Sequence, residues 1–336
     1  MKTPSMITAA GHLPEWVIWQ RRPFPDTNLL LLTGRRPALV DSGFVGHAQQ
    51  TAVWVRSHTD RLAVVVNTHW HSDHVGGNTL LQAAGARIAA SALDAAALAD
   101  QDPGCCQAEY LDQPVPQYTV GEPLTDGQAL LMGDAEWQVI GTPGHTRGHL
   151  SFWQPDRGLL IVGDALSDCD VGWVNIAIDG LDTAATALAS LHRLSDLHPR
   201  VILPAHGPIP TDPATAFITG LRRARRLVDD PAGAIGYGAR RILAFALIIR
   251  AGIPTSDINP YIRTRPWAID AARILGIKVD EFAADLIDSM LRSGAITMRD
   301  NRFHATADHS PVVAESLGMP FPPTGRISAL APIPFT

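Results

Sequence analysis

Four residues that commonly bind metal ions are crowded into one short stretch. They form the pattern His69-x-His71-x-Asp73-His74, directly after the apolar run Leu62–Asn67. Imidazole nitrogen and carboxylate oxygen are the ligand atoms that zinc and similar divalent cations take, and a strand end holds such side chains rigidly. The stretch therefore predicts a metal site at the end of a buried strand.

Three further residues of the same kind follow later, each after an apolar segment. His145 lies in the turn Thr142-Pro-Gly-His145, Asp164 follows Val162-Gly163, and His206 lies in Pro204-Ala-His206-Gly. The seven residues together complete two sites. We expect one metal at His69, His71 and His145, a second at Asp73, His74 and His206, and Asp164 between them.

Two polar residues and two tryptophans lie close to these segments in the sequence. Asp41 ends a predicted strand, so it either caps a turn or accepts a hydrogen bond from a metal-bound histidine. His149 follows the His145 turn, and we interpret it as a packing or supporting residue rather than a ligand. Trp70 and Trp173 are each either core side chains or walls of an apolar pocket. Both alternatives stay open for Asp41 and for the tryptophans.

The elements that must position these residues alternate between strand and helix patterns. Strands are predicted at 16–19, 28–34, 37–43, 62–67, 87–90, 137–141, 150–153, 159–162 and 200–203. Helices are predicted at 46–58, 76–84, 92–99, 181–195 and 211–230. Residues 102–116 are predicted to be a surface loop and a candidate lid, with Cys105 and Cys106 as ordinary thiols. This order predicts two sheets packed between layers of helices.

The ordered motifs closely resemble those of the metallo-β-lactamase superfamily. The resemblance rests on His-x-His-x-Asp-His, Thr-Pro-Gly-His-Thr, Gly-Asp and Pro-x-His-Gly, and covers about residues 25–210. It implies the α/β class, a four-layer αβ/βα sandwich and a dinuclear metal site at one edge of the sheets, with the ligands assigned above.

Particular residues distinguish between the branches of that superfamily. The family's redox-active diiron branch has a glutamate at the position of His71, so the resemblance favours two zinc ions, with iron or manganese as alternatives. True zinc β-lactamases generally lack the aspartate that stands here as Asp164. The resemblance therefore points to the glyoxalase II, lactonase, thioesterase and nuclease branches.

The chain changes character after His206. We expect a catalytic domain over 1–212, a helix and linker over 213–238, a smaller domain over 239–305, and a proline-rich tail over 306–336. Helical patterns at 240–251, 267–275 and 279–291, followed by a hairpin-like segment at 295–304, resemble a winged-helix domain.

The charges of this second part bear on its partners. Its candidate recognition helix is acidic, carrying Asp280, Glu281, Asp285 and Asp288, so nucleic acid is not the expected partner. We expect this domain instead to take part in dimerisation or to form a wall of the pocket. The preceding helix carries four arginines, and we expect a solvated basic face, with contact to an anionic substrate as the alternative. These are Arg222, Arg223, Arg225 and Arg226.

Composition and charge set the remaining expectations. The net charge of −6, the 46% hydrophobic content and the three cysteines are typical of a soluble cytoplasmic protein with no disulfide framework. We expect no membrane association, and a homodimer is an open prediction.

The predicted function is hydrolysis of an ester, thioester or lactone by a metal-bridging hydroxide, with a small acyl compound as the substrate and Asp73 helping to move the proton. Phosphodiester or nucleic-acid cleavage, an iron-dependent persulfide dioxygenase, β-lactam hydrolysis and a non-catalytic binder stay as alternatives.

Overall fold

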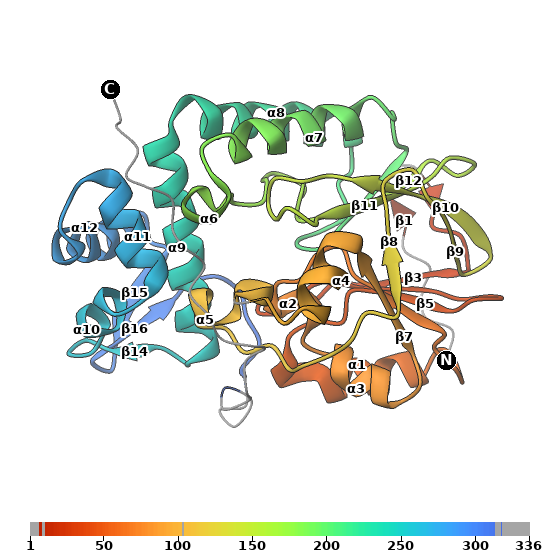
Figure 1. Cartoon of the computed structure of the whole chain (residues 1–336), viewed down its shortest axis with the longest axis horizontal. Coiled ribbons are helices and arrows are strands. Elements are labelled where there is room, and N and C mark those ends of the chain that lie inside the picture. The colour runs from red at the N-terminus through yellow and green to blue at the C-terminus, as the bar shows by residue number, and fades with distance from the viewer. Residues whose placement is uncertain (1–6, 9–10, 103, 313–316, 318–336) are drawn as a thin grey trace.

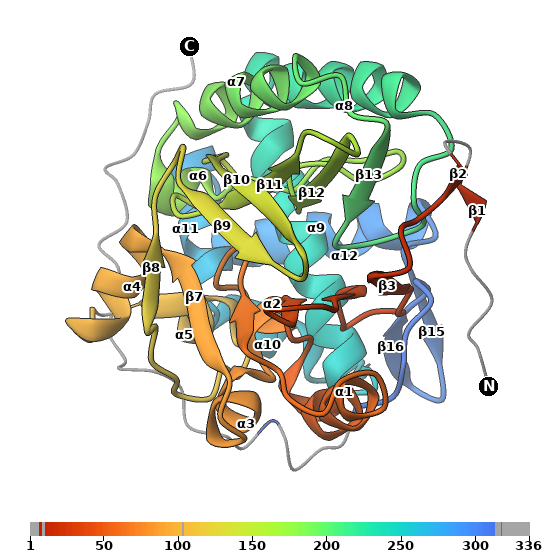
Figure 2. The same ribbon diagram turned by 90° about the vertical axis from the view of Figure 1, so that its right-hand side faces the viewer.

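Two β-sheets lie face to face, and helices cover the outer face of each (Figure 1). The computed structural model describes residues 7–8, 11–102, 104–312 and 317. Figure 2 shows the layers end-on, with α7 (Thr183–Ser195) and α8 (Pro213–Asp229) on one side. On the other side lie α1 (Ala48–Arg56) and α3 (Asn78–Ala83). The fold is the predicted four-layer sandwich of the α/β class.

The first sheet has six strands in the order β3-β4-β5-β6-β7-β8. The first three strands pair in antiparallel fashion, whereas β5 to β8 are parallel to one another. Parallel neighbours place their C-terminal ends at the same edge of the sheet. The strands are Val17–Gln20, Leu29–Leu32, Ala38–Val40, Val64–Val66, Arg87–Ser91 and Glu122–Leu124.

The second sheet has five strands in the order β13-β12-β11-β10-β9. Within it β12 and β13 are parallel, and β10 runs in the same direction as β12 because each pairs with β11 in antiparallel fashion. Three strands therefore end at the same edge. The strands are Ala129–Met132, Ala135–Gly141, Leu150–Gln154, Leu159–Gly163 and Val201–Pro204. A separate pair joins β1 (Ile7–Thr8) to β2 (Gly11–His12).

Side-chain alternation along the strands builds the layers. On β12, Leu159 and Ile161 pack between the two sheets, and Leu160 and Val162 pack against α7 and α8. Side chains of a strand alternate between its two faces, so a continuous apolar run marks a strand that is buried on both. Each fully buried side chain of this size contributes about 1.5–3 kcal/mol to folding. This burial stabilises the sheet whose edge carries the site.

Helices of the last third of the chain form a group beside the sandwich (Figure 1). Helix α9 (Pro231–Ile249) stands between this group and the sheets. It is long and apolar enough to cross a membrane by length and composition, but most of it is buried inside the protein. The group also contains α10 (Ile258–Arg263), α11 (Pro266–Leu275) and α12 (Val279–Arg292), with the small strands β14 (Ile253–Pro254), β15 (Ile296–Arg299) and β16 (Arg302–Ala305).

Two of the predictions about connecting segments are wrong. Residues 231–238 are not a linker but the first turns of α9, capped by Asp230, whose side chain accepts a hydrogen bond from Gly233 N–H. The glycines there suggested flexibility, yet a Cβ at Gly238 would lie only 3.2 Å from the Trp173 ring. The small residue is needed because the helix and that ring approach closely.

The expected surface loop at 102–116 is also largely buried. It contains the short helices η2 (Cys105–Gln107) and α5 (Ala108–Leu111). Apolar side chains of the loop join the cores on both sides of it, which a free surface excursion would not do. Cys105 and Cys106 are buried free thiols, and burial raises the pKa of Cys105 to about 11. These are inert thiols, as expected.

The predicted C-terminal boundaries and tail have a mixed outcome. The region expected to resemble a winged helix contains most of α9, the three helices α10, α11 and α12, and a sheet of order β14-β16-β15. The resemblance itself stays a prediction. In the predicted tail, Ser310 N–H donates to the Phe24 carbonyl, so the tail's first residues pack on the sandwich. Residues 313–316 and 318–336 lie outside the described residues.

Candidate metal centre

The predicted ligands come from loops at the same edge of the two sheets. His69 and His71 lie in the loop after β6, and Asp73 and His74 lie on α2 (Ser72–Val75), which follows at once. The other three residues follow β10, β12 and β13 of the second sheet: His145, Asp164 and His206. The strand directions described above therefore bring the two halves of the site together.

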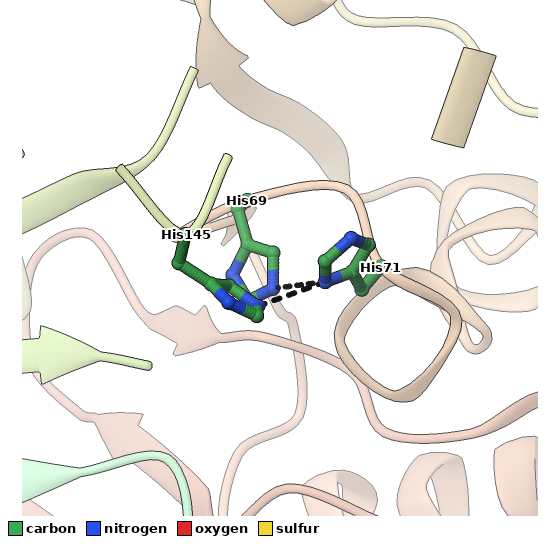
Figure 3. A group of neighbouring side chains, drawn as sticks. All are labelled: His69, His71 and His145. Carbon is green, nitrogen blue, oxygen red and sulfur yellow. Dashed lines mark hydrogen bonds between the residues drawn. The ribbon is translucent and has the colours of Figure 1, made fainter. Parts of the chain in front are cut away.

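Three imidazole rings converge in the first group. His71 Nδ1 lies 3.1 Å from His69 Nε2 and 2.9 Å from His145 Nε2 (Figure 3). Figure 3 shows that His69 and His71 come from one loop and that His145 approaches from another. The ring nitrogens of all three residues lie within 4.8 Å of one another. Three buried imidazole nitrogens that face one point are the donor set of a divalent cation.

Asp73, His74 and His206 form the second group. His206 Nε2 lies 3.2 Å from Asp73 Oδ2, and the ligand atoms of the three residues lie within 4.8 Å of one another. The His206 ring stacks on Phe24, with the ring centroids 4.8 Å apart. The chain thus supplies a mixed nitrogen and oxygen donor set for a second cation, held partly by an aromatic contact.

Asp164 lies between the two groups. Its Oδ1 is 3.3 Å from His74 Nε2 and 3.4 Å from His206 Nε2, both in the second group. Its Oδ2 is 3.5 Å from His145 Nε2 in the first group. One oxygen of this carboxylate therefore faces each group, which is the geometry that the sequence prediction required of a bridging ligand.

Divalent cations fit these residues. His74 Nε2 and Asp164 Oδ1 are buried and lie 3.3 Å apart, but neither atom makes a hydrogen bond of regular geometry within the described chain. An unpaired buried polar atom is costly, so two of them pointing into a ring of imidazole and carboxylate donors indicate a cation site.

Burial and the neighbouring imidazoles favour the neutral form of two of the histidines. Burial lowers the pKa of His69 and of His71 well below the usual value, and neighbouring histidines lower it further. For Asp164, burial opposes ionisation, but His206 and His74 outweigh it and hold the pKa of that carboxyl well below its usual range. Neutral imidazole and ionised carboxylate are the forms that bind metal. For His74 and His206, burial lowers the pKa but the nearby carboxylates outweigh it and raise the pKa, so these two rings must release a proton when an ion binds.

Hydrogen bonds behind the ligands fix their ring orientations. Asp41 accepts hydrogen bonds from Thr68 N–H, Thr68 Oγ1–H and His74 Nδ1–H, each at 2.8 Å. His145 Nδ1–H donates to the Trp173 carbonyl at 2.6 Å. In His74 and His145 these bonds place the proton on Nδ1 and leave Nε2 free to face the site. Asp41 therefore contacts and orients His74, the second of the two alternatives drawn from the sequence.

His149 supports the site through the backbone of Asp164. Its Nε2 accepts from Asp164 N–H at 3.1 Å, and its Nδ1 lies 2.8 Å from Thr142 Oγ1. Burial lowers its pKa to about 3, so the ring is neutral. His149 thus holds the backbone of Asp164, and it is not part of either group of converging atoms. This placement agrees with the predicted supporting role.

The two tryptophans of the prediction differ in their positions. Trp173 lines the cavity beside the site, and its ring stacks on His71 with the planes 6° apart. Trp70 packs against the core between the first sheet and its helices and does not line that cavity. Of the two alternatives drawn from the sequence, Trp70 takes the core position and not the pocket wall, and its neighbours His69 and His71 instead contribute ring nitrogens to the metal site.

The cavity has a volume of about 370 Å³ and is open at one side. Five of the seven predicted ligands line the cavity, while His69 and His74 are buried and do not line it. One wall comes from α9, most of which lies in the smaller domain for which a pocket-wall role was one of the two expectations. Phe24, Leu111 and the loop that contains Trp173 supply other parts. The five lining ligands are His71, Asp73, His145, Asp164 and His206.

Of the four predicted basic residues of α8, one approaches the cavity. Arg223 Nη1 lies 3.2 Å from Oδ1 of Asp170, a lining residue. Arg222, Arg225 and Arg226 do not line the cavity, which agrees with the expected solvated face.

The chain belongs to the metallo-beta-lactamase superfamily, because the model of that family matches residues 22–206, more than half of the chain. It is similar to a beta-lactamase-like protein 2 homolog of Caenorhabditis elegans, with 29% identity over 54% of this chain and 56% of that protein. It is also similar to a hydroxyacylglutathione hydrolase of Cereibacter sphaeroides, with 36% identity over 42% of this chain and 47% of that protein.

The chain spans about half the length of the curated relatives that it matches. Its fold is similar to that of a metallo-beta-lactamase family protein from Thermus thermophilus. The TM-score is 0.52 at 21% identity, and the match covers 87% of this chain and 99% of the other.

Proposed function

We propose that this chain is a hydrolase that cleaves an ester, thioester or lactone carbonyl at a centre holding two zinc ions. The observation that carries the proposal is the position of Asp164, whose two carboxylate oxygens face the two groups of ligands separately. The similarity to a hydroxyacylglutathione hydrolase supports the choice of an acyl substrate. A pair of bound zinc ions supplies a water of lowered pKa and a Lewis acid for the carbonyl oxygen.

The residues of the chain divide the remaining tasks. His71, His145 and Asp164 line the cavity, so they hold the first ion where a carbonyl can reach it. Asp73 and His206, which also line the cavity, do the same for the second ion. Asp73, whose Oδ2 lies 3.2 Å from His206 Nε2, would accept the proton of a water bound at this group. The apolar walls exclude bulk water and strengthen the electrostatic interactions at the site.

Hydrogen bonds and ring stacking keep this arrangement in place before substrate arrives. Trp173 supports two ligands at once, because its ring stacks on His71 and its carbonyl accepts from His145. Asn28 Nδ2–H donates to the carbonyls of Pro204 and Gly207, on either side of His206. Such supporting contacts commonly change metal affinity or activity by about 10- to 100-fold when they are removed.

The test is metal analysis of the purified protein together with hydrolysis of a substrate panel. The panel contains a thioester, a lactone, a β-lactam and a phosphodiester. The expected result is close to two zinc ions per chain and cleavage of the acyl compounds, both lost in His71→Ala. About one iron per chain with oxygen consumption on a persulfide would contradict the proposal.

Cleavage of the phosphodiester alone would instead favour the nuclease hypothesis. The C-terminal part gives that hypothesis little support. Four carboxylates of α12 would repel phosphate: Asp280, Glu281, Asp285 and Asp288. We propose that nucleic acid is not a partner, and that the protein acts on a small molecule in the cytoplasm.

A further inference from the structure

The cavity beside the metal centre has a polar end and is otherwise lined mainly by apolar side chains. Its polar end is the group of five lining ligands described above. Beyond them the deeply buried lining is apolar, with Leu111, Leu166, Ile242 and Ile248 all nearly inaccessible to solvent. A pocket of this volume is of the size that holds a small organic ligand. These walls match an acyl compound, which has a reactive polar end and an apolar remainder.

Helix α9 supplies four apolar residues of the cavity lining, more than any other single helix or strand, and three of them are regularly spaced. Ile242, Phe245 and Ile248 line the cavity at a spacing of three residues, so they share one face of the helix. The next positions, Leu243 and Leu247, pack in the core of the C-terminal group. Ile242 and Ile248 belong to that core as well, so this part of the helix lies at the boundary between the cavity and the core of the C-terminal group.

The charged groups of the described cavity wall are bound to one another. Arg241 forms an ion pair with Asp170 and donates a hydrogen bond to Tyr237 Oη at 3.0 Å. The Tyr237 hydroxyl donates to the Val171 carbonyl at 3.0 Å, and Arg223 contacts the other oxygen of Asp170. These mutual contacts leave the wall without a dedicated partner for a charged acyl group.

From these observations we infer that the cavity binds an apolar acyl chain of the substrate, and that the α9 face sets the length of chain accepted. The inference rests on the hydrolase function proposed above and names its substrate class. The acyl carbonyl lies at the ligands, and the chain runs along Ile242, Phe245 and Ile248. The C-terminal group of helices thus acts as a specificity element, because it provides the wall that the sandwich alone lacks.

The test uses thioesters that share one leaving group and differ in the acyl group: acetyl, butanoyl, octanoyl and dodecanoyl. For the metal-loaded wild-type protein, kcat/KM should rise about fourfold for each methylene buried, until the cavity is full. Ala244 lines the cavity and is only partly buried, so Ala244→Leu adds side-chain volume to the cavity lining, and the thermal midpoint of the variant checks that its packing against the neighbouring core is kept. In this variant kcat/KM for octanoyl should fall at least about tenfold, and that for acetyl should stay within about twofold.

A matched control and a second variant sharpen the result. Ala232→Leu makes the same change at an exposed position of the same helix, away from the cavity lining, and should leave the profile unchanged. Phe245→Ala enlarges the cavity and should shift the preference towards dodecanoyl. The inference is overturned by a flat profile across chain lengths in the wild type. It is also overturned if Ala244→Leu lowers acetyl and octanoyl turnover equally.

A binding measurement separates this inference from the proposed reaction. Octanamide carries the acyl chain without a labile ester, and its affinity is measured by calorimetry on the metal-loaded protein. Binding that Ala244→Leu weakens at least about tenfold and Ala232→Leu does not change supports the acyl pocket, even if no thioester is cleaved. In that case the hydrolase proposal alone fails. Absence of octanamide binding to the wild-type protein counts against the pocket itself.

Discussion

The substitution Asp41→Asn should weaken one metal site and spare the other. Asp41 is the acceptor for His74 Nδ1–H, and that bond leaves His74 Nε2 free to bind the ion. Its backbone φ is +56°, a left-handed conformation that asparagine adopts readily, so the change adds no strain. Size is also conserved, and the substitution therefore tests the hydrogen bond rather than the packing.

The magnitude follows from which hydrogen bonds survive in Asp41→Asn. The oxygen of the new amide can still accept from Thr68 N–H, as the aspartate does. The amide nitrogen then faces His74 Nδ1 and donates to it, so the imidazole proton moves to Nε2, where the ion must bind. Binding the ion now costs one hydrogen bond to a buried charged group, about 1.5–3 kcal/mol. The affinity of the Asp73, His74 and His206 site should fall about 10- to 100-fold.

The assay is competition for zinc with chelators of graded strength, followed by metal analysis. With a chelator of intermediate strength, the wild-type protein should retain both ions and the Asp41→Asn variant should retain the ion at His69, His71 and His145. The thermal midpoint of the metal-free protein serves as the folding control. Equal retention by the two proteins across the whole chelator series would refute the argument that Asp41 sets the tautomer of His74.

Three further outcomes are expected. Burial raises the pKa of Asp94 from 3.8 to about 7. Between these pH values the folded state keeps the Asp94 proton and the unfolded state loses it, so the free energy of unfolding falls as the pH rises. Asp94→Asn removes this loss, and its advantage in urea unfolding should grow by about 2–3 kcal/mol from about pH 5 to about pH 8. Asp112 forms an ion pair with Arg250, the residue after α9, and this contact holds the α5 segment against that helix. Asp112→Ala should therefore raise KM and the rate of proteolytic cleavage near α5, while the zinc content stays unchanged. A Cβ at Gly172 would meet the Asp164 carbonyl at 2.5 Å and His145 Nδ1 at 2.9 Å, so Gly172→Ala should lower zinc retention at least about tenfold in the chelator assay.

The ligands could be predicted from the sequence because each is local to a strand end. A strand end needs only an apolar run and a turn to be recognised, and four of the ligands stand within one six-residue pattern. Helix α4 (Ala92–Ala99) was predicted at its observed bounds for a similar reason, since Ser91 accepts from Asp94 N–H and caps it. Such local signals do not depend on the rest of the fold.

The parts that could not be predicted depend on contacts between distant segments. The first turns of α9 contain several glycines. One of them, Gly238, is explained by the close approach of Trp173, a contact that the local sequence does not reveal. The stacking of Phe24 on His206 joins residues at opposite ends of the sandwich sequence. The burial of the 102–116 segment likewise depends on helices far along the chain. No local pattern carries this information.

The position of α9 links the architecture to the proposed chemistry. The two sheets bring the ligands together at one edge, but an edge alone leaves the metal centre open to water. Because Ile242 and Ile248 of α9 belong both to the core of the C-terminal group and to the cavity lining, the folding of that group also completes the cavity. The sandwich therefore supplies the ligands of the proposed ions, and the helices enclose the cavity. This division predicts that substitutions in α9 change which substrates are accepted, whereas substitutions at the strand ends change whether metal is bound at all.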